Sequence, residues 1–318
     1  TTTGPIAIGD WFLSDTSTNL TKFPVPSGTI LPANGYIVFT EYSNFGTHAL
    51  GADGFALSEH GDTVYLSAGT NGMPAEPAYR ESEDFGAAER NVTLGRYTKS
   101  DDSVDFTMMS APTPNGVNAY PLVGPVVISE VMYHPEEPGS FEFIELYNIT
   151  GSDVNLADSE NPANTWKLTG AIDFMFPPDV VIGATNFVLV VPTDANTFRS
   201  VYTSVPAGVE IYGPYSGQLD NAGESIRLFK PGEPEPAFVP NILVERVEYD
   251  DKAPWTSVAD GNGPSLHRII TEDYGNDNIN WMATGDGGSP GLSLPKVSIT
   301  SPEIGDDFLI PFSTTIKV

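Results

Sequence analysis

The sequence contains the stretch Phe23-Pro-Val-Pro-Ser-Gly-Thr-Ile-Leu-Pro-Ala-Asn-Gly-Tyr-Ile-Val38 and, further along, Phe174-Met-Phe-Pro-Pro-Asp-Val-Val-Ile-Gly-Ala-Thr-Asn-Phe-Val-Leu189. At one constant offset the two stretches carry the same kinds of residue: Phe23 and Phe174, Pro26 and Pro177, Ala33 and Ala184, and Tyr36 and Phe187. Such agreement indicates an internal repeat, and a repeat decides the architecture because each copy must form a similar unit.

Three further blocks repeat downstream in the same order. They are Leu57-xxx-Gly61-Asp62-x-Val64-x-Leu66 and Leu219-xxx-Gly223-Glu224-x-Ile226-x-Leu228, then Leu94-Gly-Arg96 and Leu266-His-Arg268, then Thr113-Pro-Asn-Gly116 and Ser289-Pro-Gly291. The gaps between blocks differ in length, as expected where strands are kept and loops vary. The sequence therefore predicts two copies of one module.

Each block has the pattern of strand and turn. Val64 and Leu66 alternate with more polar neighbours, which is typical of a half-buried strand. Asn34-Gly35 supplies a turn before the apolar run 36–39, for which we expect a strand. Only residues 194–202 have the pattern of a helix longer than a turn or two. Short, regularly spaced strands predict an all-β protein of two tandem β-sandwiches.

The repeat also sets the expected boundaries. The first module covers residues 1–118, a short linker covers 119–125, and the second module covers 126–293. Residues 294–318 begin a new alternating apolar stretch that is too short to bury a core of its own, so we expect the start of a further domain.

Composition narrows the function. The chain has no cysteine, which excludes disulfides, thiolate metal sites and cysteine nucleophiles. A net charge of −28, from 42 acidic and 14 basic residues, repels nucleic-acid phosphates and anionic membrane surfaces. No apolar stretch is long enough to span a bilayer. We therefore expect an acidic extracellular protein with neither nucleic-acid binding nor membrane insertion.

The second module resembles the bacterial form of the lamin tail domain over nearly its whole length. The motifs that carry the resemblance are Ile128-Ser-Glu-Val-Met-Tyr-His-Pro135, Glu142-Phe-Ile-Glu-Leu-Tyr-Asn148, Val154-Asn-Leu156, Trp166-Lys-Leu168, Gly263-Pro-Ser-Leu-His-Arg268, Asn280-Trp281 and Ser289-Pro-Gly291. The resemblance implies immunoglobulin-like β-sandwiches within a large exported bacterial protein, where such modules accompany enzymatic or adhesive domains. The tail after residue 297 resembles the opening of another immunoglobulin-like domain.

The first module departs from this pattern, because counterparts of the strands around 128–134 and 142–148 are missing. A sandwich without two strands exposes sheet edges and apolar faces. The favoured explanation is an N-terminally incomplete module. The alternative is completion by a strand from a neighbouring subunit, as in an extracellular fibre or surface layer.

No residue pattern predicts catalysis. The four histidines, His48, His60, His134 and His267, lack ligand spacing and are expected in loops or at strand ends. Glu142 and Glu145 must point to opposite faces of a strand, so they cannot act together on a glycosidic bond. Glu145 shares its face with Phe143 and Tyr147, which predicts a buried hydrogen-bond acceptor that holds a loop. The sequence contains no GxSxG motif.

Two sets of residues are weak candidates for binding. Acidic loops at Asp250, Asp251, Asp273 and Asp277 offer oxygen ligands for a structural calcium ion, although the pattern of an EF-hand is absent. Trp255 lies in a loop-like stretch and is the candidate for ligand binding, whereas Trp11 and Trp166 occupy equivalent repeat positions and are expected in the cores. No other cofactor is indicated.

Together these features predict a non-catalytic structural or adhesive module at the cell surface or outside the cell. Its partners would be neighbouring domains or subunits of the same protein. The alternative is a module that binds a polysaccharide or protein ligand and targets an attached enzyme.

Overall fold

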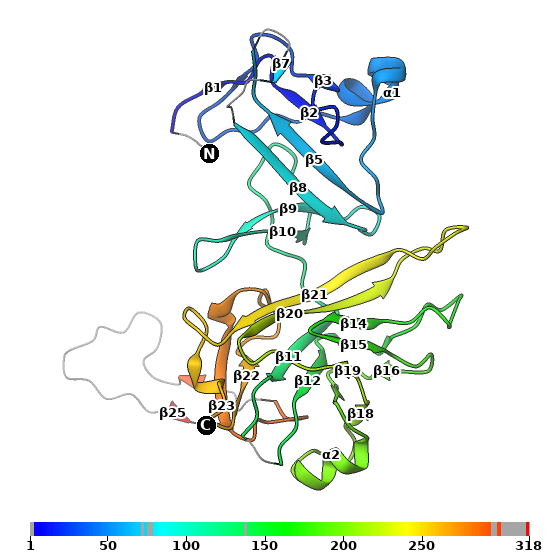
Figure 1. Cartoon of the computed structure of the whole chain (residues 1–318), viewed down its shortest axis with the longest axis vertical. Helices are drawn as coiled ribbons and strands as arrows, with labels where there is room; N and C mark the ends of the chain where they lie inside the picture. The colour runs from blue at the N-terminus through cyan, green and yellow to red at the C-terminus, as the bar shows by residue number, and fades with distance from the viewer. Residues whose placement is uncertain are drawn as a thin grey trace, which may run out of the picture.

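The computed structural model describes residues 3–70, 73–74, 79–136, 139–293, 298–299 and 316–317, and it confirms the all-β prediction (Figure 1). The longest helix in these ranges is α2 (Ala195–Val201), where the sequence predicted it. The Asp194 carboxylate caps α2 by accepting hydrogen bonds from the backbone N–H groups of Asn196 and Thr197. The other helical turns are η1 (Glu41–Phe45), α1 (Thr47–Leu50), η2 (Gly51–Asp53), η3 (Ser257–Ala259) and η4 (Asn278–Asn280). No helix of the described ranges is long and apolar enough to cross a membrane.

Two sheets build the second module. The larger sheet has the strand order β18 (Glu210–Tyr212), β17 (Phe187–Val190), β12 (Phe143–Asn148), β11 (Val126–Met132), β22 (Pro264–Arg268) and β23 (Trp281–Asp286). The smaller sheet has the order β19 (Ser216–Gly217), β15 (Ile172–Met175), β14 (Lys167–Gly170), β20 (Gly223–Pro231) and β21 (Asn241–Asp250). Only β17 and β18 pair in parallel in these sheets. A short ribbon joins β13 (Val154–Asn155) to β16 (Val181–Ile182).

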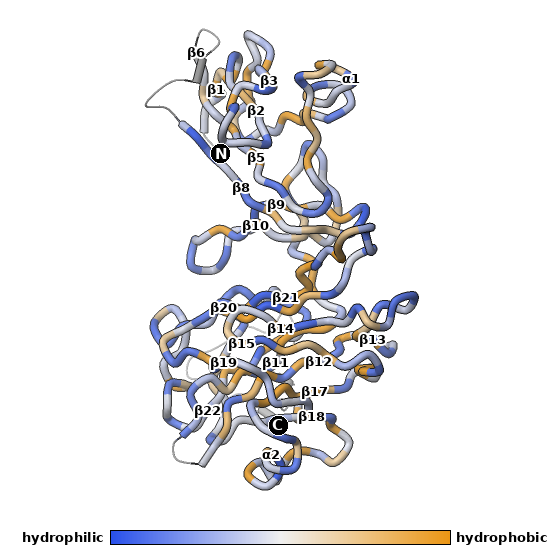
Figure 2. Tube along the Cα trace, turned by 45° about the vertical axis from the view of Figure 1, so that its right-hand side comes forward, coloured by the Kyte–Doolittle hydropathy of each residue, from blue (hydrophilic) through white to orange (hydrophobic). Residues whose placement is uncertain are grey.

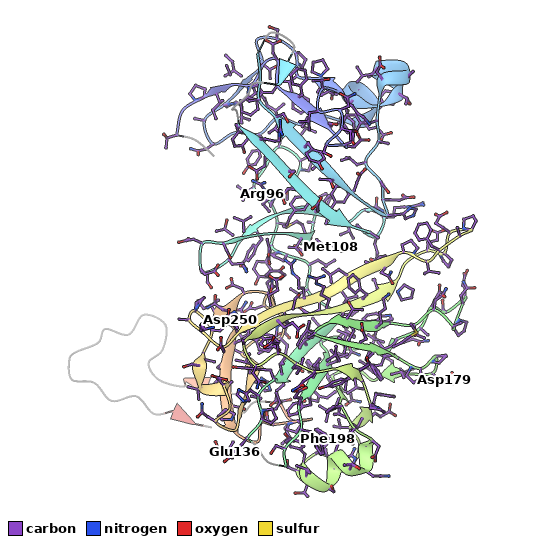
Figure 3. All side chains as sticks on the ribbon, viewed as in Figure 1. Arg96, Met108, Glu136, Asp179, Phe198 and Asp250 are labelled. Atoms are coloured by element: carbon purple, nitrogen blue, oxygen red, sulfur yellow. The ribbon has the colours of Figure 1, made fainter. Side chains whose placement is uncertain are left out.

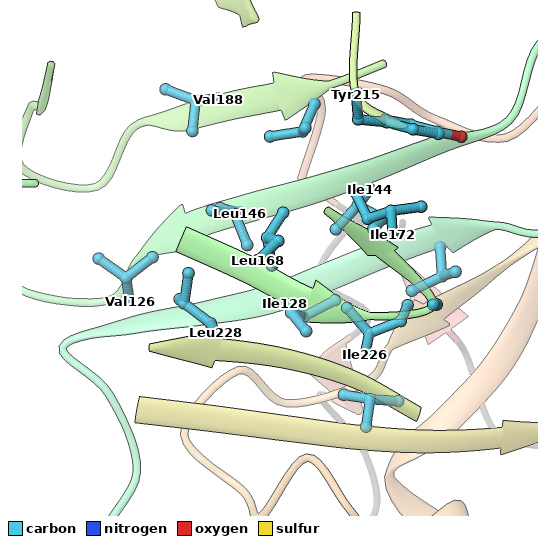
Figure 4. Close-up of a cluster of buried hydrophobic side chains, with 14 of the residues drawn as sticks. Val126, Ile128, Ile144, Leu146, Leu168, Ile172, Val188, Tyr215, Ile226 and Leu228 are labelled. Carbon is cyan, nitrogen blue, oxygen red and sulfur yellow. The ribbon is translucent and has the colours of Figure 1, made fainter. Parts of the chain in front are cut away.

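The core of the second module lies between these sheets. Alternate side chains of β11 and β12, such as Ile128 and Ile144, face those of β14 and β20, such as Leu168 and Ile226 (Figure 4). All four of these side chains are fully buried. On the outer side of the six-stranded sheet, Phe198 of α2 packs against residues of β11, β12 and β17. The six-stranded sheet therefore has buried apolar side chains on both faces.

The first module has one main sheet, with the order β3 (Phe23–Pro24), β2 (Phe12–Ser14), β5 (Gly61–Ser67) and β8 (Arg80–Gly86). Three further two-stranded ribbons accompany it: β1 (Ile6–Ala7) with β4 (Ile30–Leu31), β6 (Gly69–Thr70) with β7 (Met73–Pro74), and β9 (Thr93–Thr98) with β10 (Val104–Met109). Its core is small and centres on Phe23, Val25 and Phe55.

The main sheet of the first module repeats part of the second module in strand order and in register. Leu13 lies opposite Phe23 on one side and Leu66 on the other. Leu168 lies opposite Phe174 and Leu228 in the same way. The matched sequence blocks that begin at Phe23 and Phe174 therefore occupy equivalent positions of like topology.

Two of the two-stranded ribbons in the first module also have counterparts in the second module. The pair Ile6 and Leu31 in β1–β4 corresponds to the pair Val154 and Ile182 in β13–β16. The hairpin β9–β10 corresponds to β22–β23, because Leu94-Gly-Arg96 and Leu266-His-Arg268 occupy the first strand of each. No counterpart of β11 or β12 occurs among the described residues of the first module.

One strand expectation is wrong. Residues 36–39 form no strand, although their counterpart β17 is a core strand of the second module. β17 is a strand because it pairs with β12 on one side and β18 on the other. Without such neighbours, an extended apolar run gains no ladder hydrogen bonds. The turn before it forms as predicted, with the Gly35 N–H donating to the Pro32 carbonyl and Asn34 at a φ of 50°.

The hairpin β9–β10 lies between the main sheet of the first module and strands β20 and β21 of the second (Figures 1 and 2). The predicted linker runs along β10: the Ser110 N–H donates to the Tyr120 carbonyl, and Pro121 forms a bridge with Met109. Of the predicted further domain at 294–318, only β24 (Ser298–Ile299) and β25 (Ile316–Lys317) lie within the described residues. The remainder of that prediction falls outside them.

Candidate functional site

Two carboxylates and an imidazole meet on the outer face of the six-stranded sheet. Glu130 on β11 lies directly opposite Glu145 on β12 and opposite His267 on β22. The ligand-capable atoms of the three side chains lie within 4.8 Å of one another, and all three side chains are buried. Of the two groups of three or more such side chains among the described residues, this one is fully buried.

A β-bulge places Glu130 in this group. The register of β11 against β12 shifts between Ile128 and Glu130, which leaves Ser129 as the extra residue. Simple alternation after Ile128 would turn the side chain of residue 130 into the apolar core. The bulge turns Glu130 outward instead and returns Val131 to the core. The Ser129 hydroxyl then donates to Glu145 Oε1 at 2.7 Å.

The two carboxylates hold the segment that contains Ser289-Pro-Gly291. Glu130 accepts hydrogen bonds from the Ser289 backbone N–H (2.7 Å) and hydroxyl (3.0 Å), and from the Ser265 hydroxyl. Glu145 Oε2 accepts from the Gly291 N–H at 2.5 Å. Gly288 adopts a φ of +69°, and a Cβ there would lie 2.6 Å from Glu130 Oε1. Glu145 therefore has its predicted role, a buried acceptor that fastens a loop.

Burial governs the protonation of this pair. Burial raises the pKa of Glu145 well above its ordinary value, and the neighbouring Glu130 charge raises it further. Burial also raises the pKa of Glu130, although His267 and the Ser265 and Ser289 donors act in the opposite direction. Two adjacent carboxylates at low dielectric cannot both ionise without a counter-charge. Burial and the neighbouring Glu130 charge therefore favour the protonated form of Glu145 through its raised pKa.

His267 has a defined tautomer. Its Nδ1 lies 2.9 Å from the Arg268 carbonyl, and a carbonyl only accepts, so Nδ1 carries the hydrogen. Nε2 is buried without a hydrogen-bond partner among the described residues. His267 lies inside β22 next to its last residue, and the local sequence pattern does not indicate its carboxylate neighbours. Those neighbours are distant in sequence, and only the strand order brings them together.

The burial of Glu130, Glu145 and His267 limits the chemistry that these side chains can perform, because solvent and substrates do not reach them. Three ligand-capable side chains can share a proton or hold a divalent cation. A second such group, Glu59, His60 and Glu235, lies on the surface between the modules. The buried group cannot process a substrate, because Glu130 and Glu145 have no exposed surface. Glu142, immediately before β12, accepts from the Tyr215 hydroxyl (2.7 Å) and the Leu219 N–H (3.1 Å).

A second polar network joins the two modules. Asp105 of β10 is buried and accepts from Arg246 (2.7 Å), the Tyr274 hydroxyl (2.9 Å) and the Asn276 amide (2.7 Å). Burial raises the pKa of Tyr274, and the Asp105 charge adds to the effect. All three partners of Asp105 belong to the second module, so this carboxylate fixes the β9–β10 hairpin against it.

The candidate calcium residues serve separate contacts. Asp277 is buried and accepts from the Ser100 N–H (3.0 Å) and from the Ser100 hydroxyl, so it also joins the modules. Asp250 accepts from the Lys252 N–H, and Asp251 lies 3.2 Å from the Lys252 ammonium. The Asp273 carbonyl accepts from Arg268. None of the four aspartates belongs to a group of three or more potential ligand side chains in the described ranges.

The four tryptophans lie in or against the two cores. Trp166 is buried in the core of the second module, and Trp11 is half-buried against the core of the first. Trp255, the candidate for ligand binding, is also half-buried, with its ring centroid 6.0 Å from that of Trp281. The Trp281 indole N–H donates to the Gly275 carbonyl at 2.7 Å. Trp255 therefore packs partly against the core of the second module.

A repeated ion pair was not anticipated from the sequence. In the second module Arg268 donates to Glu245 at 2.9 Å, and both side chains are buried. In the first module Arg96 pairs with Glu81 at 2.7 Å, between β8 and the β9–β10 hairpin (Figure 3). Glu245 lies opposite Leu228 and Glu81 lies opposite Leu66, which are matched positions of the repeat. Arg96 and Arg268 belong to matched blocks of the sequence repeat, whereas Glu81 and Glu245 belong to none.

Fold and site together define an immunoglobulin-like β-sandwich in which the Glu130–Glu145–His267 group is buried and the two carboxylates hold a loop in place. Residues 121–250 match the model of the Lamin Tail Domain family. The match covers β11 to β21 and less than half of the chain. No curated protein and no solved structure matches the chain.

Proposed function

We propose that this chain is a non-catalytic structural or adhesive part of a large exported or cell-surface protein, in which two tandem lamin-tail-like modules space the neighbouring domains. The observation that carries the proposal is the buried junction around Asp105. A flexible linker would let the modules move independently, whereas Asp105 and Asp277 bind partners across the junction. A fixed relative position is what a spacer requires.

Two further features support a non-catalytic role. The Glu130–Glu145–His267 group is inaccessible to a substrate. The Lamin Tail Domain family that residues 121–250 match is a family of non-catalytic modules. The net charge of −28 favours solubility and opposes binding to anionic polymers, which suits an extracellular position.

Small-angle X-ray scattering of the whole chain tests the spacer role. We expect a single rigid arrangement of the modules that is the same at about 0.1 M and about 0.5 M salt, where the Debye length is roughly 10 Å and 4 Å. The arrangement should not respond to salt because the Asp105 network is buried. Asp105→Ala is expected to increase the maximum dimension and the flexibility, whereas the exposed Asp101→Ala of the same hairpin should change neither. A flexible native chain would contradict the proposal.

A glycan array separates this role from polysaccharide binding. We expect no glycan to bind above background, because Trp255 is half-buried against Trp281. Binding that is lost in Trp255→Ala and retained in the Trp11→Ala control would favour the targeting function instead. Screens for esterase and glycosidase activity are expected to show none, and turnover by the purified chain would contradict a non-catalytic role.

A further inference from the structure

The buried group of Glu130, Glu145 and His267 has no lysine or arginine as a charge partner in the described ranges. Arg268, the residue after His267 in β22, forms its ion pair with Glu245 instead. Protonation of Glu145, which its raised pKa favours, neutralises one of the two carboxylates. A single divalent cation neutralises both, and buried charges that are not paired with one another commonly bind metal ions.

His267 has the hydrogen bonding of a metal-ligating histidine. Its Nδ1 donates to the Arg268 carbonyl at 2.9 Å, which leaves the lone pair on Nε2. Nε2 has no hydrogen-bond partner among the described residues, although His267 is only 3% exposed. Histidines that ligate metals almost always donate their other ring N–H to a carbonyl, a carboxylate or water. A buried nitrogen with a free lone pair beside two carboxylates therefore points to a cation.

The repeat shows that the hairpin itself does not require this histidine. Gly95 occupies the position of His267 in the matched block Leu94-Gly-Arg96, and β9 still pairs with β10 along its whole length. The first module has no counterpart of Glu130 or Glu145 among its described residues. The imidazole therefore occurs in the module that also contains the two buried carboxylates.

The two carboxylates have lone pairs left for an ion. A carboxylate has about four acceptor sites. Glu130 accepts three hydrogen bonds, all from Ser265 and Ser289. Glu145 accepts two on its carboxylate, from a serine hydroxyl and a backbone N–H. These donors fix the orientation of both side chains, as the hydrogen bonds around metal-ligating carboxylates do.

The spacing of the three side chains suits a small tetrahedral ion. Their ligand-capable atoms lie within 4.8 Å of one another. Zn²⁺ binds nitrogen and carboxylate oxygen at about 2.0–2.2 Å, which places tetrahedral ligands about 3.3–3.6 Å apart. Displacements of less than about 1 Å per side chain would close the group on such an ion. The remaining position suits a water molecule or the Ser265 hydroxyl, which already donates to Glu130.

We infer that Glu130, Glu145 and His267 bind one divalent transition-metal ion, with Zn²⁺ as the best match to one imidazole and two carboxylates. Ca²⁺ and Mg²⁺ match the group poorly, because they require six or more ligands and select oxygen. The ion fastens the loop that contains Ser289 and Gly291 to β11, β12 and β22. This site goes beyond the spacer role, because it assigns a structural ion to the second module.

Metal content of the whole chain tests the site. The His60→Ala chain is used, because the exposed Glu59–His60–Glu235 group also offers zinc ligands. The chain is unfolded in urea with EDTA, which removes metal from a buried site, and is refolded with Zn²⁺ or with Ca²⁺. Unbound metal is removed by gel filtration before mass spectrometry of the elements. We expect about one Zn²⁺ per chain and almost no Ca²⁺, because zinc binding is coupled to folding.

Variants of the ligands locate the ion. His267→Gln or Glu145→Gln, each added to His60→Ala, should reduce the bound Zn²⁺ at least about tenfold, because each removes a direct ligand. Glu136→Gln in the same background is the exposed control and should keep the full zinc content. Circular dichroism checks that each variant is folded. Chelator treatment also defines the metal-free state, in which Glu145 titrates without a competing ion.

Co²⁺ provides a measurement that needs no substitution at the site. Refolded with Co²⁺, the His60→Ala chain should show the visible absorption of tetrahedral cobalt, and Zn²⁺ should remove it. Any one of three results would overturn the inference: no zinc on the His60→Ala chain, equal zinc content after His267→Gln or Glu145→Gln, or a cobalt spectrum like that of the six-coordinate aqueous ion.

Discussion

The first and second modules contain the same ion pair in different surroundings. Arg96 and Glu81 are 44% and 38% exposed, whereas Arg268 and Glu245 are 0% and 4% exposed. The register that brings each pair together is the same. The difference shows that strand pairing alone fixes which residues meet, whereas the covering sheet decides how much their contact contributes to stability.

Removal of the arginine should produce the largest contrast. Arg268→Ala leaves Glu245 buried without its counter-charge, which we expect to cost about 3–5 kcal/mol of the free energy of unfolding. Arg96→Ala should cost at most about 1 kcal/mol, because water screens the exposed pair. Urea unfolding followed by tryptophan fluorescence measures both. Equal losses would show that the two pairs do not differ in environment as described.

A core leucine sharpens the same comparison. Leu168 is fully buried between two sheets, so Leu168→Ala should cost about 2–5 kcal/mol. Leu13, at the matched position, is only half-buried, and Leu13→Ala should cost about 1 kcal/mol, in proportion to the smaller apolar area that it buries. Urea titrations of the two variants provide the test. A loss at Leu13 as large as that at Leu168 would mean that a complete core already covers the first sheet.

The smallest expected effect is a pH dependence confined to the second module. The folded-state pKa of Glu145 is raised by burial, so its contribution to stability is complete below the unfolded pKa of about 4.3 and is lost as pH rises through the folded pKa. The free energy of unfolding should therefore fall between pH 5 and 8. The raised pKa values of Glu130 and Glu245 act in the same direction.

Glu145→Gln isolates this contribution, because the amide keeps the shape of the side chain and removes the titration. We expect a shallower decline between pH 5 and 8 than in the native chain, measured by thermal unfolding at each pH. Glu136→Gln, at an exposed position, is the matched control and should follow the native curve. A native curve that rises with pH over this range would contradict the raised pKa of Glu145.

Much of the fold could be predicted from the sequence because it is encoded locally. The matched blocks around Leu66 and Leu228 contain both the alternation of a strand and the turn before it, and their pairing partners follow in the same order. The prediction failed at residues 36–39, where apolar character indicates a strand but no described strand pairs with the segment. Strand formation there depends on a partner that the local pattern does not contain.

The buried site could be predicted only in part. Alternation along one strand separated Glu142 from Glu145 and assigned Glu145 to a loop-holding role. Glu130 and His267 were missed because the bulge at Ser129 reverses the expected face of Glu130, and because His267 arrives from a strand far along the chain. A bulge and a distant pairing both depend on tertiary structure, so the local pattern gave no signal for either.

Native-state hydrogen exchange of the unmodified chain tests the central claim most directly: that the first module repeats the second but has no counterpart of β11 or β12 among its described residues. The amides of 187–190 should be strongly protected, and those of 36–39 should exchange at nearly the rate of an unstructured peptide. Comparable protection of the two segments would contradict the claim, because it would mean that residues 36–39 already pair with a neighbouring strand.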